Sequence, residues 1–201
     1  MPAIGAGSFA RLPSIDELRK RHAEGRLKSL SELSFQYHGI GPTDPRFEPY
    51  WALAEELDVP VGIHMGPGAP GKTYFAAPEY RVALSDPILL EPVLVNHPRL
   101  RIFVVHAGYP MKERMLALMA AYPNVYAEFG FLTVGYRDSD VWPYMQSFID
   151  AGFEDRILYG TDQMVWPEAI SYSINRVRKF LYENAARFLR IDPAETGILR
   201  H

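Results

Sequence analysis

Short apolar runs alternate along the chain with segments of helical spacing, and this alternation indicates an α/β fold. Runs rich in β-branched residues are typical of strands buried on both faces. They occur at 100–106, 124–129 and 156–161, and in a run that ends at residue 64, whereas 27–37 alternates imperfectly and indicates a strand with a loop. Apolar residues recur at helical spacing over 13–24, 47–58, 87–95, 111–121, 141–151 and 171–189. This succession predicts a parallel sheet with right-handed crossovers.

Three of these runs end on a residue that can bind a metal ion or transfer a proton. They are Val-Pro-Val-Gly-Ile-His64, Arg-Ile-Phe-Val-Val-His106 and Arg-Ile-Leu-Tyr-Gly-Thr-Asp162. In parallel α/β folds the carboxyl ends of strands hold the reacting groups. We therefore expect the two imidazoles and the carboxylate to converge on one pocket, where a His, His, Asp set suits a zinc-like divalent ion.

Each of these residues also has a structural interpretation. A single histidine at the end of an element more often packs than binds a metal, but the repeated order of strand, histidine and glycine turn favours function. Asp162 alone could equally cap a helix. Glu32 and Glu128 lie within predicted strands, where an unpaired charge is costly to bury. We interpret Glu128 as a structural acid or one that supports the ligands, whereas Glu32 could equally be a ligand or a supporting acid.

The irregular stretch 66–86 is long enough to cover a pocket, although a solvated loop is an equal alternative. Tyr109 and Trp166 are candidates to contact a planar substrate, but buried core aromatics are as common. The other four histidines lack the strand-end context, and we expect them at the surface. They are His22, His38, His97 and His201.

Composition narrows the class of protein. The 201 residues are 48% hydrophobic, which favours a single domain over 1–201. Lys and Arg total 21 against 24 Asp and Glu, so the net charge of −3 does not favour nucleic acid as a partner. No cysteine is present, which leaves histidine and carboxylate as the strong metal ligands. Without a leader or a membrane span in the sequence, we expect a soluble cytoplasmic protein.

Several longer motifs together resemble the amidohydrolase-related metal-dependent hydrolases and decarboxylases, a family that includes aminocarboxymuconate semialdehyde decarboxylase. They are Tyr-Trp-Ala-Leu-Ala-Glu-Glu-Leu before the His64 run, Val-Val-His106-Ala-Gly, Asn-Val-Tyr-Ala-Glu-Phe, Ile-Leu-Tyr-Gly-Thr-Asp162 and Glu-Asn-Ala-Ala-Arg-Phe-Leu. The resemblance extends from about residue 27 to about residue 190. No nucleophile-elbow, P-loop or dinucleotide motif competes with it.

This resemblance implies a TIM-type (β/α)₈ barrel, with His64 after strand five, His106 after strand six and Asp162 after strand eight. It implies that His64 and Asp162 bind a divalent metal, zinc or alternatively manganese. His106 would be a third ligand or the residue that moves protons, and His106 and Asp162 would be catalytic. The expected activity is hydrolysis or non-oxidative decarboxylation of a small carboxylated or cyclic molecule.

One part of the family pattern is missing. The first strand of the family supplies a His-x-His pair, and this sequence contains none. We therefore expect a partial barrel of about strands 3–8, with weakened metal affinity and open strand edges that favour a homo-oligomer. The alternative to an enzyme is a catalytically inactive partial barrel that acts through association.

Overall fold

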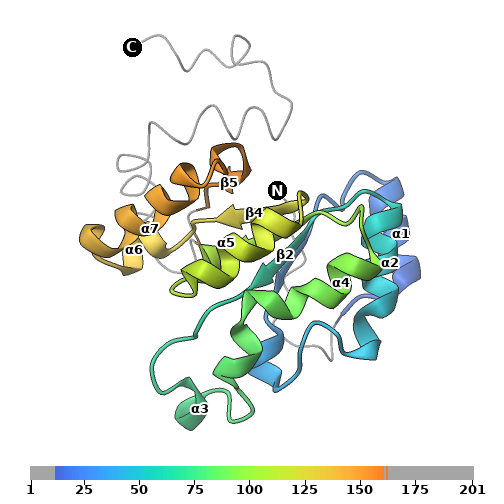
Figure 1. Ribbon diagram of the computed structural model, residues 1–201. Coiled ribbons are helices and arrows are strands. Elements are labelled where there is room, and N and C mark those ends of the chain that lie inside the picture. Colours follow the sequence, from blue (N-terminus) through green and yellow to red (C-terminus); the bar gives the residue numbers. More distant parts are fainter. Residues whose placement is uncertain (1–11, 161, 163–201) are drawn as a thin grey trace, which may run out of the picture. The chain divides into compact units, whose positions relative to one another are not determined.

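The computed structural model describes residues 12–160 and 162, and its strands form one parallel sheet (Figure 1). Each strand follows the previous one in the order β1-β2-β3-β4-β5, as the predicted βα succession requires. The strands are β1 (Leu30–Leu33), β2 (Val61–His64), β3 (Ile102–Val105), β4 (Val125–Glu128) and β5 (Ile157–Leu158). The five predicted strands are confirmed.

One helix precedes β1, and the others lie between consecutive strands along the chain. The helices are α1 (Ile15–Ala23), α2 (Glu48–Glu56), α3 (Lys72–Phe75), α4 (Glu91–Asn96), α5 (Lys112–Ala121), α6 (Leu132–Gly135) and α7 (Asp138–Asp150). The predicted cap of the first helix is confirmed, because the Ser14 side chain accepts a hydrogen bond from the Glu17 N–H at 3.2 Å. No described helix has the length and apolarity needed to cross a membrane.

Some boundaries differ from prediction. The strand predicted over 27–37 is shorter, because residues 35–38 turn into a 3₁₀ helix that buries Phe35 and Gln36. The helix predicted to begin at residue 141 begins at Asp138. The helix predicted over 171–189 and the candidate substrate residue Trp166 lie outside the described residues.

The chain divides into two compact units, residues 1–126 and 127–201. In the first unit β2 pairs in parallel with both β1 and β3, and all four of its residues are buried. The aromatic rings of Phe35, Phe47 and Trp51 pack together, with the first two centroids 4.6 Å apart. The burial of β2 on both faces was predicted from its apolar run.

The second unit has a smaller core between β4, β5 and α7. Phe129 packs edge-on against Phe148 with ring centroids 5.5 Å apart, and Tyr144 lies 5.3 Å from the same ring. Val141 and Met145, from successive turns of α7, are buried as well. The buried side of α7 thus follows its helical spacing.

Candidate metal centre

The carboxyl ends of three strands in the first unit bring together an acid and two histidines. Glu32 comes from β1, His64 ends β2, and His106 directly follows β3. In the register of β2 and β3, His64 lies opposite Val105, so His106 begins one residue beyond that pair. One potential ligand atom from each of the three side chains lies within 4.8 Å of the others. This cluster is the candidate metal centre.

The carboxylate of Glu32 contacts the Nδ1 atom of His64. The Glu32 Oε1 atom lies 2.5 Å from His64 Nδ1, and the Glu32 and His64 side chains are 32% and 11% exposed. Gln36 secures the backbone of the same residue, because its Nε2 donates to the His64 carbonyl at 3.1 Å. With the hydrogen on Nδ1 donated to Glu32, the lone pair of the imidazole is on Nε2.

The other ring nitrogen of His64, Nε2, makes no such contact in the described part of the chain. Among the described residues, His64 Nε2 is buried and has no hydrogen-bond partner. Buried polar atoms are nearly always paired, so such an atom calls for a missing partner. The His106 ring stands edge-on to the His64 ring, with centroids 4.7 Å apart and planes at 83°. A carboxylate and two imidazoles form a donor set that suits zinc or manganese.

The turn after β3 has an unusual backbone. His106, Ala107 and Gly108 have φ values of 60°, 51° and 65°, in the left-handed region that side chains rarely adopt. The Tyr109 N–H donates to the His106 carbonyl at 2.9 Å and closes the turn. A Cβ on Gly108 would lie 2.7 Å from the Pro87 ring, so the turn is tightly packed. Such strain is concentrated at functional sites.

The charge state of Glu32 follows from its neighbours. Burial opposes ionisation of this carboxyl group. The hydrogen bond with His64 and the electrostatic interactions with the His64 and His106 rings outweigh burial and lower the pKa of Glu32 below its ordinary 4.5. Glu32 is therefore an anion at neutral pH. It can hold a proton on His64 Nδ1 or contribute an oxygen to a cation.

The stretch 66–86 is an ordered loop beside this cluster. The Gly66 N–H donates to the Ser85 carbonyl at 2.9 Å, and the Arg81 N–H donates to the Gln36 carbonyl at 3.1 Å. Gly66 has a φ of 92°, and a Cβ there would lie 2.3 Å from the carbonyl oxygen of Tyr109. The loop is thus anchored to the segments that follow β1 and β3, and its role as the cover of a pocket stays a prediction.

The remaining candidates from the sequence come from the second unit and from the turn after β3. Asp162 belongs to the second unit, where it is half-buried with a φ of 47°. Glu128, in the same unit, is buried and accepts a hydrogen bond from the Gly130 N–H at 2.8 Å. Tyr109 is half-buried in the turn after His106. The ligand roles of His64, His106 and Asp162 and the substrate role of Tyr109 stay predictions.

One histidine was misjudged from the sequence, and one site neighbour was missed. His97 was expected at the surface, but it is 6% exposed, with Nε2 3.0 Å from Glu48 and Nδ1 3.4 Å from Glu55. Its acidic partners lie more than 40 residues away, so no local pattern marks it. Tyr37 was not singled out, yet its ring lies edge-on to His64 with centroids 5.5 Å apart.

One of the comparisons with known proteins shows the family. The amidohydrolase family model matches residues 6–191, and the chain therefore belongs to the amidohydrolases. No curated protein matches the sequence.

Solved structures with the same fold are TIM-barrel proteins and enzymes. An uncharacterised TIM-barrel protein from Bordetella bronchiseptica is 19% identical, with a TM-score of 0.60 over 94% of this chain and 65% of its own. A probable 2-pyrone-4,6-dicarboxylic acid hydrolase from Acinetobacter baumannii, with citric acid bound, is 16% identical, with a TM-score of 0.59 over 87% and 68%.

A third structure is 5-carboxyvanillate decarboxylase from Novosphingobium aromaticivorans, complexed with manganese and 4-hydroxy-3-methoxy-5-nitrobenzoic acid. It is 15% identical, with a TM-score of 0.58 over 88% of this chain and 60% of that one. The five-stranded parallel sheet is thus part of a TIM-type barrel, and the chain spans about two thirds of the length of the Bordetella protein. The predicted family and fold class are confirmed.

Proposed function

We propose that this chain supplies the metal centre of an enzyme that hydrolyses or non-oxidatively decarboxylates a small carboxylated or cyclic molecule. The observation that supports the proposal best is His64, whose Nδ1 is held by Glu32 while its buried Nε2 has no partner among the described residues. An imidazole prepared in this way is typical of metal ligands, since a carboxylate on one nitrogen fixes the lone pair on the other.

The cluster fits a divalent ion of the zinc or manganese type. A bound ion would polarise a substrate oxygen and lower the pKa of a bound water. His64 would be a ligand, and His106 either a second ligand or the group that transfers a proton to or from the substrate. Glu32 would keep the His64 ring in one orientation. The manganese complex of the structurally similar decarboxylase supports this choice of ions.

Asp162 remains the candidate third ligand and second catalytic residue. Tyr109 and Trp166 remain candidates for substrate contact. These assignments rest on the family resemblance, as do the small-molecule substrate, the homo-oligomer and the cytoplasmic location. Membership of the amidohydrolase family supports the reaction class.

Metal content tests the proposal directly. The protein is purified without chelator, and metal per chain is measured by inductively coupled plasma mass spectrometry for the wild type, His64→Ala and the matched control His22→Ala on α1. We expect about one zinc or manganese per chain in the wild type and the control, and none with His64→Ala. Far-UV circular dichroism confirms that each variant is folded.

Activity assays then distinguish hydrolysis from non-oxidative decarboxylation. The metal-replete protein is assayed with aromatic carboxylic acids for CO₂ release and with cyclic esters for ring opening. Turnover should vanish with chelator and return with metal. A wild type without metal, whose mass in solution rises with concentration, would contradict the proposal and favour the inactive partial barrel.

A further inference from the structure

The loop after β2 places an ammonium group beside the aromatic ring that contacts His64. Lys72 opens α3, and its Nζ lies 5.6 Å from the centroid of the Tyr37 ring. The same Tyr37 ring stands edge-on to His64 at 5.5 Å. From this juxtaposition we propose that Lys72 binds a carboxylate of the substrate. This inference deepens the proposed function and rests on it, since it names the residue that selects acidic substrates.

Lys72 has a positive charge that no acid among the described residues neutralises, as a carboxylate-binding role requires. Its side chain is half-buried between two rings, with Nζ 5.8 Å from the centroid of Phe75 as well. Among the described residues no carboxylate forms an ion pair with it, whereas Arg19, Arg21 and Arg101 are each paired with an acid. A partly desolvated ammonium without a counter-ion attracts an anion more strongly than an exposed, paired one.

Two tyrosines provide an apolar surface next to this charge. The Tyr37 and Tyr80 rings lie 5.3 Å apart, and the Tyr80 hydroxyl accepts a hydrogen bond from the Gly68 N–H at 3.0 Å. A Cβ on Gly68 would lie 2.5 Å from the Tyr37 hydroxyl, so the loop packs closely on both rings. Aromatic faces beside a cation suit a ring that bears a carboxylate.

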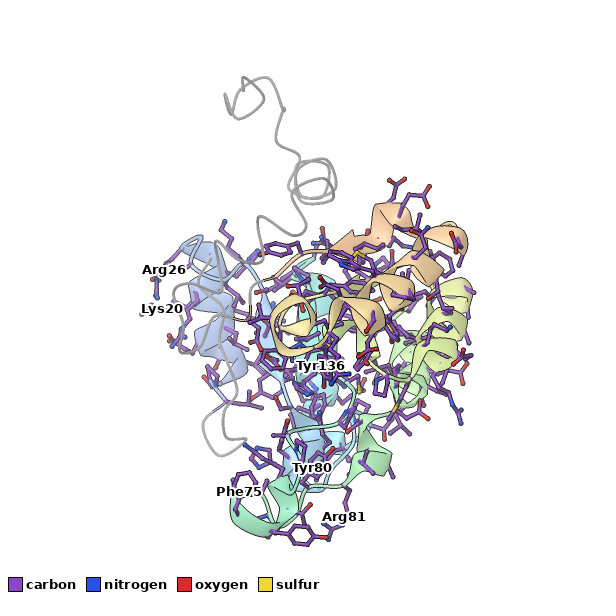
Figure 2. All side chains as sticks on the ribbon, turned by 90° about the vertical axis from the view of Figure 1, so that its left-hand side faces the viewer. Lys20, Arg26, Phe75, Tyr80, Arg81 and Tyr136 are labelled. Atoms are coloured by element: carbon purple, nitrogen blue, oxygen red, sulfur yellow. The ribbon has the colours of Figure 1, made fainter. Side chains whose placement is uncertain are left out.

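The loop that carries Lys72 is anchored by the same residue that contacts the backbone of His64. The Gln36 side chain donates to the His64 carbonyl, while the Gln36 carbonyl accepts from Arg81 in the loop. Figure 2 shows Phe75, Tyr80 and Arg81 together on the part of the chain around α3, apart from Lys20 on α1 and Arg26 just after that helix. This shared anchor lets the loop present Lys72 at a defined place relative to the metal centre.

The alternative is that Lys72 only covers aromatic surface through cation–π contacts. The two interpretations differ in what removal of the charge does to ligands. A covering role predicts equal effects on charged and neutral ring compounds, whereas a carboxylate-binding role predicts a loss confined to the anion.

The test compares benzoate with its neutral analogue benzamide. Dissociation constants for the metal-loaded protein are measured by NMR titration for the wild type, Lys72→Met, Lys72→Arg and Lys20→Met. Lys20→Met removes the same charge from exposed α1 and is the matched control. We expect Lys72→Met to weaken benzoate binding about tenfold or more. Benzamide binding and the control should be unchanged, and Lys72→Arg should retain most of the benzoate affinity.

Three outcomes would overturn the inference. They are a wild type that does not bind benzoate, a Lys72→Met variant that binds benzoate as tightly as the wild type, and an equal loss for benzamide. Metal content is measured on the same samples. Metal at wild-type level with Lys72-independent benzoate binding overturns this inference alone, while a wild type without metal overturns the proposed function. Thermal unfolding shows whether each variant is folded.

Discussion

Glu32 and Glu128 are both acids in parallel strands, one in each unit, yet their partners differ. Glu32 contacts an imidazole nitrogen at 2.5 Å, and the other nitrogen of that ring has no described partner. Glu128 accepts from the Gly130 backbone N–H at 2.8 Å, and a Cβ on Gly160 would overlap its Oε1 at 1.7 Å. The first acid orients an imidazole, whereas the second braces a turn. The partner of a buried acid, rather than its burial, indicates its role.

The ends of β3 and β5 can be compared as well. His106 and Asp162 both follow a short strand and both have a positive φ, 60° and 47°. Histidine and aspartate both adopt this conformation more readily than most residues, but His106 is followed by Ala107, which also has a positive φ of 51°. The His106 turn is therefore the more strained of the two, and its surroundings must stabilise it.

The largest effect is expected when alanine replaces either of two closely packed glycines, Gly66 beside the turn after β3 or Gly160 beside Glu128. Gly66→Ala adds a Cβ 2.3 Å from a backbone oxygen, at a φ of 92°, and should lower the free energy of unfolding by roughly 3 kcal/mol. Gly160→Ala meets the end of the Glu128 side chain, which can move by giving up its bond to Gly130, so we expect about 1–2 kcal/mol. Urea denaturation measures both.

Gly25→Ala is the control for backbone strain alone. Gly25 has a φ of 68°, but an added Cβ would meet nothing within 4 Å, so the cost should be about 1 kcal/mol. If Gly66→Ala costs no more than this control, the close approach between the loop and the Tyr109 carbonyl does not stabilise the fold.

Asp162→Asn tests whether the second unit contributes a metal ligand. Asparagine tolerates a positive φ as well as aspartate does, so the backbone should be preserved. Loss of the anionic ligand should weaken metal affinity by about 100-fold, measured by competition with a chromogenic chelator. Asp155→Asn is the control. Equal affinities for the two variants would remove Asp162 from the proposed centre.

Replacing Glu32 or Glu128 by glutamine, one at a time, tests the different roles assigned to these two acids. Glu32→Gln removes the charge that holds His64 Nδ1 and should weaken metal affinity about 10–100-fold. Glu128→Gln keeps an oxygen for the Gly130 N–H, so its metal affinity should match the wild type. The same chelator competition measures both variants. A larger loss for Glu128→Gln would reverse the roles assigned to the two acids.

The smallest effect concerns a third acid, Asp44, whose side chain is 18% exposed. The Arg46 side chain and backbone N–H both donate to Asp44 and lower the pKa of its carboxyl from an ordinary 3.8 to about 2. Because the folded pKa is depressed, this stabilisation is complete above pH 3.8 and is lost as the pH falls towards 2. NMR titration should place the midpoint near 2, and Arg46→Ala should raise it. An unchanged midpoint in that variant would contradict the assigned cause.

The positions of the strands were predictable because a strand that is buried on both faces is marked in the sequence by a short run of apolar residues. Val61–His64 reads as an uninterrupted apolar run, and all of it is buried. The end of β1 was harder to predict. Phe35 continues the apolar pattern of the strand, but the chain turns into a 3₁₀ helix there and packs that ring against Phe47 and Trp51. This tertiary packing outweighed the local strand preference.

The sequence by itself determined that His64 and His106 end neighbouring parallel strands, because hydrophobic period and turn residues define each element locally. Only the tertiary structure decided which atoms meet. Register and loop path place Glu32 on His64 Nδ1, leave Nε2 buried, and bring Lys72 over Tyr37. They also bury His97 between two acids of α2. Such contacts join residues distant in the chain, and periodicity specifies the face of a strand but not its partners.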